Sequence, residues 1–302
     1  MQSKFPPRLR AVLQALFVTF LWSTSWVFIK FGLNDIPPLT FAGLRYFLAF
    51  LVLIPFYARS NSVTPLRTLS RRDWWRLIAL GLVYYTVTQG TQFLALVYLP
   101  AITFSLLLNG TAVVVAVLGI FLLREIPTWL QWIGALLFIA GALLFFYPFL
   151  IPTGQTIGYL IAVVNILATS MSSIMGRGIN RQARIHPLTV TLVSMGIGSI
   201  ILLGAGLLVE PWPSFNLRSW AIILWLAVVN TAFAFTLWNL TLRTLSAMES
   251  SVINNTMLIQ ITILAWLFLG ETLTWIETIG LLLAALGALL VQVRFSNRKA
   301  KP

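Results

Sequence analysis

The sequence predicts an all-α polytopic membrane protein in which ten transmembrane helices form two inverted five-helix repeats around a central cavity. Three observations support this fold class. The 302 residues are 59% hydrophobic and 9% charged, whereas about a quarter of a soluble domain is charged. Many apolar runs are long enough to cross a bilayer. Finally, the second half of the chain repeats much of the first.

Ten stretches have the length and apolar character of membrane spans. Each holds roughly 20 residues, which is what a helix needs to cross the hydrocarbon core. The expected spans are residues 11–31, 38–57, 75–98, 101–123, 129–148, 157–176, 187–209, 219–242, 247–269 and 275–294. The first span is not expected to be a cleaved signal peptide, because it is too long, lacks a small-residue cleavage site and leads directly into the second span.

The basic residues predict the orientation of the chain in the membrane. If the N-terminus is cytoplasmic, 17 of the 20 Lys and Arg residues fall on the cytoplasmic side, Lys30 and Arg218 fall on the other, and Arg45 lies within a span. Cationic loops stay in the cytoplasm during insertion, so both termini are expected there and the protein in the cytoplasmic (inner) membrane. Topology and anionic lipid account for the net charge of +13, and no nucleic-acid partner is expected.

The internal repeat predicts how the spans are grouped. "LGIFLLREIPTWLQWIGALLFIAGALLFFYP" at 118–148 recurs as "LAWLFLGETLTWIETIGLLLAALGALLVQVR" at 264–294, and "PPLTF" at 37–41 resembles "HPLTV" at 186–190. Each half holds five spans, and an odd number inverts the second copy in the membrane. Inverted repeats are typical of transporters whose halves move around a central site. The expected domains are 1–149, 156–294 and a basic cytoplasmic tail, 295–302.

Parts of the repeat have a structural explanation. "TWLQ" at 128–131 and "TWIE" at 274–277 fit a capping box, in which the Thr and the Gln or Glu satisfy free amides at a helix start. Two pairs of glycines seven residues apart predict smooth surfaces for close helix packing. These are Gly134 and Gly141 in the first half, and Gly280 and Gly287 in the second. The glutamates that end two spans, Glu125 and Glu271, are expected to anchor the adjoining turns.

Several segments together resemble a known family. They are "WSTSWVFIKFGL" (22–33), "PPLTFAGLRYFLA" (37–49), "LALVYLPAITFSLLLNGTAVVVAVLGIFLLRE" (94–125) and "LGETLT" (269–274). On these segments the chain resembles the EamA-type members of the drug/metabolite transporter superfamily. The resemblance implies a helical bundle around a central cavity that moves small metabolites, often amino acids, outward across a bacterial inner membrane. The chain departs from the family pattern at 110–113, which reads "GTAV", and Ser194 stands near the place of a second-half counterpart to Arg45.

Polar and aromatic residues within the spans are the candidates for substrate contact. Tyr85, Gln89 and Gln92 are spaced i, i+4, i+7 and therefore share one helical face. Asn109 and Asn255 stand 146 residues apart, near the middle of the fourth and ninth spans. Amides can bind either end of a zwitterion, and aromatic rings can form the apolar walls of a pocket. The candidate substrate-binding residues are Trp22, Arg45, Tyr85, Gln89, Gln92, Asn109, Trp238 and Asn255.

A structural role competes with each of these assignments. Hydrogen bonds between membrane helices contribute only about 0.6 kcal/mol on average, so buried Ser and Thr need no functional explanation. For Gln89, Gln92, Asn109 and Asn255 the structural and functional interpretations carry equal weight. The aromatic candidates, Trp22, Tyr85 and Trp238, could instead face lipid.

Three charged residues also have two interpretations. Arg45 is close enough to its span end to extend to the outer interface, but it could also attract a carboxylate or close an outer gate. Lys30 is nearer its helix end, so extension to the interface is expected. Glu249 is expected to complete a capping box with Ser246 in "SAME".

The sequence predicts a secondary transporter that exports neutral or aromatic amino acids by alternating access. Drugs or phosphorylated solutes such as nucleotide sugars are alternative cargoes, although the latter call for several cations. A lipid-modifying enzyme is a remote alternative, because the chain offers only two Asp residues, on opposite sides of the membrane, and one His. With no Cys and one His, no metal site is expected, and no cofactor either. The expected partners are a small-molecule substrate and the lipid bilayer; the oligomeric state and ion coupling stay open, and a homodimer is compatible with the sequence.

Overall fold

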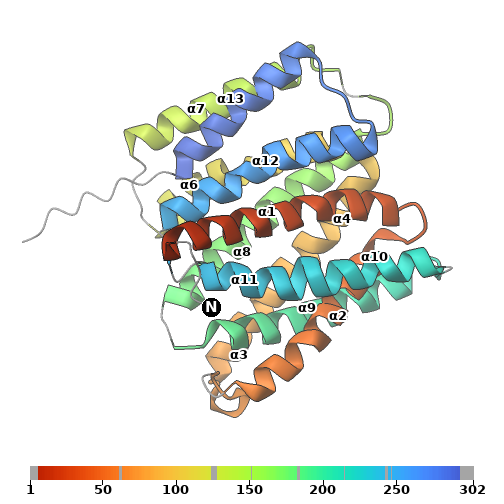
Figure 1. Cartoon of the computed structure of the whole chain (residues 1–302), viewed down its shortest axis with the longest axis vertical. Coiled ribbons are helices and arrows are strands. Elements are labelled where there is room, and N and C mark those ends of the chain that lie inside the picture. The colour runs from red at the N-terminus through yellow and green to blue at the C-terminus, as the bar shows by residue number, and fades with distance from the viewer. Residues whose placement is uncertain are drawn as a thin grey trace, which may run out of the picture.

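The computed structural model describes residues 6–60, 63–123, 128–150, 152–181, 184–213, 215–241, 244–245 and 247–292, and these contain helices but no strands (Figure 1). The elements are α1 (Pro7–Gly32), α2 (Pro38–Arg59), η1 (Leu66–Thr68), α3 (Arg71–Leu80), η2 (Gly81–Thr88), α4 (Gln89–Tyr98), α5 (Ala101–Asn109), α6 (Thr111–Leu123), α7 (Trp129–Phe145), α8 (Thr156–Arg181), α9 (Pro187–Val209), α10 (Leu217–Ala227), η3 (Val228–Phe233), α11 (Ala234–Thr241), α12 (Ala247–Leu269) and α13 (Trp275–Gln292).

The helices confirm the predicted class of polytopic membrane protein. Within the described residues, 8 helical segments are long and apolar enough to cross a membrane, and α7 is a shorter apolar helix. The remaining predicted span, 75–98, falls on α3, η2 and α4, which follow one another without a break. Its Tyr, Thr and Gln residues make this segment more polar than the others.

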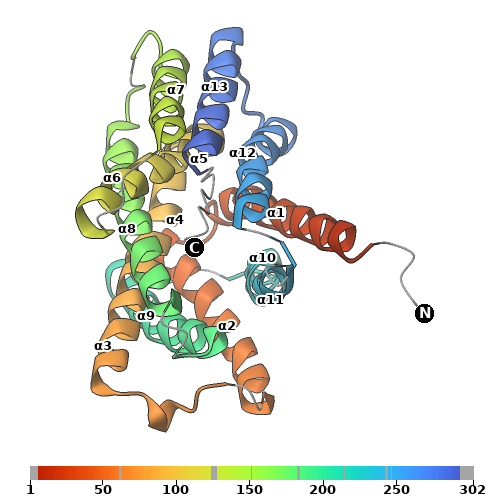
Figure 2. The ribbon, with the colours of Figure 1, turned by 90° about the vertical axis from the view of Figure 1, so that its left-hand side faces the viewer.

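The last helices of the two halves, α7 and α13, lie side by side and antiparallel (Figures 1 and 2). A methyl group on Gly134 would come within 2.6 Å of the backbone N of Val291, and one on Gly280 within 2.5 Å of the backbone N of Phe145. Gly141 and Gly287 face the opposite helix equally closely. The predicted glycine surfaces are therefore confirmed, and they pack against each other.

The second helices of the two halves, α2 and α9, pair in the same antiparallel way. A methyl group on Gly43 would meet the backbone of Leu203 at 2.5 Å, and one on Gly206 would meet the backbone N of Thr40 at 2.6 Å. Their ends are also joined by hydrogen bonds. The Glu210 carboxylate, just after α9, accepts the backbone N–H groups of Leu39 (2.8 Å) and Thr40 (2.7 Å) at the start of α2.

The third span of each half contains a π-helical segment, η2 in the first and η3 in the second. A threonine hydroxyl donates to the carbonyl five residues earlier at each segment: Thr88 to Val83 (3.0 Å) and Thr231 to Leu226 (2.8 Å). Each segment is bonded to the opposite half. Asn165 of α8 donates to the carbonyl of Thr88 (2.7 Å), and Arg45 of α2 donates to the hydroxyl of Thr231 (3.1 Å).

One end of the bundle is closed by hydrogen bonds between helix ends. We call it the sealed end; it comprises residues 33–37, 99–100, 210–213, 215–216 and 270–274, on the right of Figure 1. The Glu271 carboxylate accepts the N–H groups of Ala101 (2.6 Å) and Ile102 (2.8 Å), and Lys30 Nζ donates to the carbonyl of Leu99 (2.7 Å). Glu271, which is expected to anchor its own adjoining turn, instead binds with its carboxylate the start of α5 in the other half. Glu125 lies outside the described residues.

Two expectations about helix ends are confirmed, and two stay predictions. Lys30 donates to the carbonyl of Leu99, which lies at the sealed end, so its extension to the outer interface stays a prediction. Glu249 forms an ion pair with Arg8 of α1, and its expected capping partner, Ser246, lies outside the described residues, so that capping box also stays a prediction. The capping boxes at Thr128–Gln131 and Thr274–Glu277 are present: Thr128 N–H donates to Gln131 Oε1 at 2.9 Å, and Thr274 N–H to Glu277 Oε2 at 2.7 Å.

Candidate functional site

A cavity of about 760 Å³ lies between helices of both halves. Its lining combines five amides, four hydroxyls, one arginine and one tryptophan with apolar side chains. The lining residues are Trp26, Ser105, Leu108, Asn109, Thr111, Ala112, Val115, Ala116, Gln131, Thr169, Ser173, Arg177, Asn254, Asn255, Met257, Leu258, Ile261, Val291 and Gln292. The volume and the mixture of groups suit a small-molecule site, since such pockets measure roughly 300–1,000 Å³.

The cavity reaches the end of the bundle opposite the sealed end. Gln131 lies in the first turn of α7, Gln292 is the last residue of α13, and Arg177 lies one turn before the end of α8. By the alternation of the helices, these three residues share one end, which we call the cavity end. The orientation predicted from the loops makes this end cytoplasmic.

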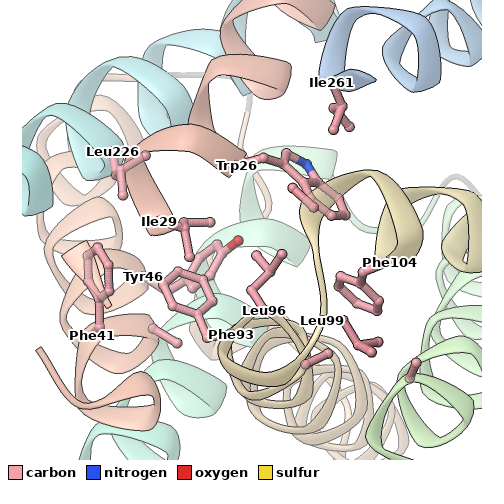
Figure 3. Close-up of a cluster of buried hydrophobic side chains, with 14 of the residues drawn as sticks. Trp26, Ile29, Phe41, Tyr46, Phe93, Leu96, Leu99, Phe104, Leu226 and Ile261 are labelled. Atoms are coloured by element: carbon pink, nitrogen blue, oxygen red, sulfur yellow. The ribbon is translucent and has the colours of Figure 1, made fainter. Parts of the chain in front are cut away.

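The inner part of the cavity is closed by aromatic packing. Trp26 of α1 is 4% exposed, and its ring centroid lies 5.4 Å from that of Phe104 of α5. Figure 3 shows Trp26 between Phe104 and Ile261 of α12. Beyond it, Ile29, Leu96 and Leu99 fill the space toward the sealed end with buried apolar side chains (Figure 3). The cavity therefore does not continue through the molecule.

Asn109 and Asn255 bring amide groups from equivalent positions of the two halves to the same cavity. Asn109 Nδ2 donates to the carbonyl of Ser105 (2.8 Å), one turn earlier in α5, which leaves its carbonyl oxygen as the acceptor of that side chain. Asn255 Oδ1 accepts from Gln292 Nε2 at 3.2 Å. These bonds fix both amides against their own half of the bundle.

The two copies of this span differ at the asparagine. In the first half the helix is irregular at the single residue Gly110, between Asn109, the last residue of α5, and Thr111, the first of α6. In the second half α12 runs unbroken through Asn255 and Thr256. Because Gly is a poor helix residue, its presence at 110 explains why this irregularity occurs in only one copy.

One face of α8 supplies a second polar strip. Thr169, Ser173 and Arg177 are spaced by four residues and all line the cavity. Ser173 donates its hydroxyl proton to the carbonyl of Thr169 (2.8 Å) in its own helix. Its oxygen therefore remains able to accept a hydrogen bond from the cavity side. Asp, Glu and Lys are absent from the described lining residues.

Three predicted site residues form a separate buried cluster. Arg45 is 4% exposed, so it does not reach the interface; it bonds Thr231, and its guanidinium lies 5.1 Å from the ring centre of Tyr46. The Tyr46 hydroxyl donates to Gln89 Oε1 at 2.6 Å, and the Tyr46 ring meets that of Tyr85 edge-on at 5.7 Å. This cluster holds α2, η2, α4 and η3 together and lies outside the cavity lining.

The remaining three predicted residues are also outside the cavity lining. Trp22 of α1 packs against Trp238 of α11 with ring centres 5.2 Å apart, and its indole N–H donates to the carbonyl of Asn230 (3.1 Å). This contact joins α1 to the third span of the other half. Gln92 is half-buried on α4. Of the eight predicted residues, the structure thus brings only Asn109 and Asn255 into one cavity.

Residues that the sequence-based prediction missed make up most of the polar lining. Arg177 is one of the 17 basic residues predicted on the cytoplasmic side, and its four-residue spacing from Thr169 and Ser173 is the signal that places it on their face. Gln131 was assigned only to a capping box; its Nε2 also donates to the carbonyl of Val291 (2.9 Å) beside the cavity. No sequence pattern distinguishes Gln292 or Trp26 as a residue that lines the cavity.

A second hollow, of about 380 Å³, has a different character. It is lined by Leu107, Phe138, Ile139, Ala142, Leu143, Phe146, Phe149, Leu150 and Tyr159. Apart from the Tyr159 hydroxyl these side chains are apolar, so the hollow offers little to orient a polar solute. Within the described residues no cluster of three or more His, Asp or Glu side chains could hold a metal ion.

Comparison with known proteins accounts for the doubled architecture. The EamA-like transporter family matches the chain twice, over residues 9–147 and 156–293. The chain belongs to this family. The matched ranges fall close to the two halves expected from the repeat. The family and the helical structure together establish a multi-span membrane protein of a transporter family.

Relatives of this EamA-family chain carry transporter names. An uncharacterized transporter of Archaeoglobus fulgidus is 26% identical over 91% of this chain and 94% of its own. YoaV of Bacillus subtilis, also named an uncharacterized transporter, is 26% identical over 96% and 99%. A probable amino-acid metabolite efflux pump of Escherichia coli is 26% identical over 95% and 96%. One solved crystal structure, 22% identical, has a TM-score of 0.64 over 94% of this chain and 97% of that one, which shows the fold.

Proposed function

We propose that this protein is a secondary transporter that exports neutral or aromatic amino acids and similar amphipathic metabolites across the cytoplasmic membrane. The observation that carries the proposal is the cavity lined by Asn109 and Asn255, one from each half. A site shared by two inverted halves can be exposed to either side of the membrane when the halves rock against each other. Such a transporter alternates between two states, each open to one side of the membrane. A closed sealed end and an accessible cavity end are expected of one of these states.

The chemistry of the cavity supports a zwitterionic or neutral polar cargo. The hydroxyl oxygens of Ser105 and Ser173 are acceptors, because both hydroxyl protons are donated to backbone carbonyls, and the amide oxygen of Asn109 is an acceptor by its chemistry. Acceptors of this kind suit an ammonium group. Trp26, Leu258 and Ile261 offer an apolar surface for a side chain. The name of the E. coli relative, a probable amino-acid metabolite efflux pump, agrees with this cargo class.

Phosphorylated solutes such as nucleotide sugars are a weaker candidate. A phosphate group is usually bound by several cations or N–H donors. Among the described lining residues, Arg177 alone is charged. We do not expect an enzymatic role, a cofactor or a nucleic-acid partner, and we leave a homodimer as a proposal for cross-linking to test.

Counterflow in proteoliposomes tests the proposal without assuming a driving ion. Purified protein is loaded with unlabelled amino acids and offered labelled L-phenylalanine, L-leucine or L-threonine in turn, with no ion gradient. We expect saturable exchange of at least one of them. Silence across the panel, from protein shown to be folded, would refute the amino-acid assignment. A pH gradient added to an active preparation then tests proton coupling.

Two variants test the site itself. Asn109→Leu and Asn255→Leu remove the amides with little change in volume, and we expect each to lower exchange roughly tenfold, the effect of losing one good hydrogen bond to a charged group. Gln92→Leu is the matched control, because it makes the same change on a span that does not line the cavity. Normal exchange by both asparagine variants, or an equal loss in Gln92→Leu, would refute the assignment of the site.

A further inference from the structure

The indole N–H group of Trp26 is a hydrogen-bond donor that the described part of the chain does not use. Trp26 is 4% exposed and lines the cavity. None of the described residues accepts a hydrogen bond from it. The fully buried polar atoms without a partner are Thr40 Oγ1, Thr111 Oγ1 and Asn230 Oδ1, so the Trp26 N–H group is not sealed off but reached from the cavity. Figure 3 shows the indole nitrogen on the edge of the ring turned toward Ile261, another lining residue.

A second tryptophan of the same helix shows the usual arrangement. Trp22, one turn earlier in α1, is only half-buried and donates its indole N–H to the carbonyl of Asn230 (3.1 Å). Buried tryptophans usually find such a partner, because an unpaired buried donor costs free energy. A phenylalanine at position 26 could pack on Phe104 without leaving a donor unused. The more deeply buried tryptophan is thus the one whose N–H remains for another molecule.

Two further polar groups without a protein partner line the same cavity. Asn109 Nδ2 donates to the carbonyl of Ser105, but Asn109 Oδ1 accepts from none of the described residues. Thr111 Oγ1 is likewise without a partner in the described chain, and its atom is fully buried. With Trp26 these residues offer one donor, one acceptor and one hydroxyl that can act as either. All three groups are neutral.

We propose that Trp26, Asn109 and Thr111 form the subsite that recognises the polar head group of the solute. In this subsite the Trp26 N–H donates to a carbonyl or carboxylate oxygen, and Asn109 Oδ1 accepts from an N–H donor next to that oxygen. Three neutral groups suit a head group without net charge, such as an amino-acid zwitterion or a carboxamide. The inference deepens the proposed function and rests on the cavity being the transport site.

The position of Trp26 links this subsite to the closed part of the bundle. The Trp26 ring packs on that of Phe104 with centroids 5.4 Å apart, and this contact closes the inner part of the cavity. A solute that bonds to the Trp26 N–H is therefore in contact with the barrier that has to open toward the sealed end. The face of the ring stays apolar, so the head group and the apolar atoms of a solute use different parts of Trp26.

Competition by two analogues tests the proposal. Exchange of labelled L-phenylalanine is inhibited with L-phenylalanine itself or with phenethylamine, which keeps the ring and the amino group but has no oxygen acceptor. In the wild type we expect phenethylamine to inhibit roughly tenfold more weakly. Trp26→Phe removes the N–H group and keeps an aromatic ring. It should bring the two inhibition constants together by weakening phenylalanine alone.

The control is Trp22→Phe, which removes the neighbouring indole N–H outside the cavity lining. It should retain the wild-type difference between the two inhibitors. If Trp26→Phe weakens both inhibitors equally, its role is structural and the proposal is wrong. If the full difference survives in Trp26→Phe, another group recognises the oxygen and the proposal is again wrong.

Solvent exchange tests the donor itself, whatever the cargo is. In full-length protein labelled with 15N-tryptophan, the indole N–H signals of Trp26 and Trp22 are identified by their loss in the two Phe variants. We expect the Trp26 N–H to exchange with deuterium roughly tenfold faster, because only the Trp22 N–H is bonded to a carbonyl. Exchange at Trp26 as slow as at Trp22 would contradict a free donor in the cavity.

Failure of the amino-acid assignment can be told apart from failure of this inference. Should no amino acid exchange, the same labelled protein is titrated with benzamide, a neutral probe with a carbonyl oxygen beside an N–H donor. A shift of the Trp26 indole signal without a shift of the Trp22 signal would support the subsite without the amino-acid assignment. A shift of neither signal, or of both, would overturn it.

Discussion

The two ends of the bundle are built from equivalent segments, but they are held by different chemistry. Thr64 follows α2 and Glu210 follows α9, which are the second helices of the two halves. At the sealed end, the Glu210 carboxylate accepts two N–H groups at the start of α2. At the cavity end, the Thr64 hydroxyl accepts one, from His186 at 2.9 Å before α9.

This difference shows that the repeat determines where the helices lie, but not how strongly hydrogen bonds join the helix ends of one half to those of the other. A carboxylate at a helix start forms charge-assisted bonds and also interacts favourably with the helix dipole. A hydroxyl does neither. Glu271 adds a second carboxylate of this kind at the sealed end. At the sealed end, two carboxylates of the second half therefore bind the starts of α2 and α5 in the first half. At the cavity end, the polar cavity separates the two halves.

The largest expected effect is on accessibility, and the natural chain helps because it contains no cysteine. Ser173→Cys places a thiol in the cavity; Thr40→Cys places one at the sealed end, where Thr40 is 1% exposed. We expect a membrane-impermeant thiol reagent to label the first faster by on the order of a hundredfold, because the second needs a local opening of about 3 kcal/mol.

The same two variants test the orientation. Reagent applied in inside-out vesicles reaches the cytoplasmic side and should label Ser173→Cys, while reagent applied to whole cells should not. Labelling from the opposite side would reverse the predicted topology. Equal rates at both thiols would contradict the distinction between a sealed end and a cavity end.

The next largest effect is expected at Glu271. Glu271→Ala leaves the N–H groups of Ala101 and Ile102 without their acceptor, at a cost of about 1–3 kcal/mol in the free energy of unfolding. Thermal melting of detergent-purified protein measures the loss. Glu277→Ala, at an exposed capping box of the same end, is the matched control and should cost about 1 kcal/mol or less. If Glu277→Ala lost as much stability as Glu271→Ala, the claim that the Glu271 carboxylate contributes specially by joining the two halves would be wrong.

A smaller effect is expected at Lys30. Lys30→Met keeps the length of the side chain but removes the bond to the carbonyl of Leu99, which should lower stability by about 1 kcal/mol. Arg218→Met is the comparison, since Arg218 lies 5.8 Å from the ring centre of Phe31 and should contribute less, about 0.5 kcal/mol. Unchanged melting of Lys30→Met would show that water replaces the lysine at no cost.

The smallest effect is expected at the cavity end, at Asp73. The hydrogen bond from the Ser70 hydroxyl (2.6 Å) lowers the pKa of Asp73 below its usual value of 3.8. Because the folded-state pKa is depressed, the stabilisation is present above the unfolded pKa and is lost as pH falls through the folded one. Melting of wild type and Asp73→Asn should therefore differ at neutral pH and converge below about pH 4. A constant difference down to about pH 3 would contradict this.

Sequence patterns predicted the parts of the fold that depend on local chemistry. The glycines of α7 and α13 and the capping box at Thr128 follow from spacing alone, and the structure confirms both. Periodicity also placed Tyr85, Gln89 and Gln92 on one side of a helix. It could not say that Gln89 would meet Tyr46 of α2, because that depends on which helices become neighbours.

The candidate site was less predictable for the same reason. The equivalence of Asn109 and Asn255 was visible in the repeat, and both line the cavity. Arg177 looked like one cation among many near a loop, since position along a helix does not reveal whether a side chain faces lipid, water or a cavity. The hydrogen bond from Lys30 to the carbonyl of Leu99 could not be predicted, because the two residues stand 69 positions apart in the sequence.

The glycine contacts between α7 and α13 have a mechanical consequence. Backbone meets backbone along this pair, so no side chain at the contact can change rotamer to let one helix slide past the other. A slide of one turn, about 5.4 Å, would drive the bulky side chains that flank the glycines into the opposite backbone. We therefore expect the two helices to stay in register with each other. In the proposed alternating access, this pair would be the axis about which the two halves turn.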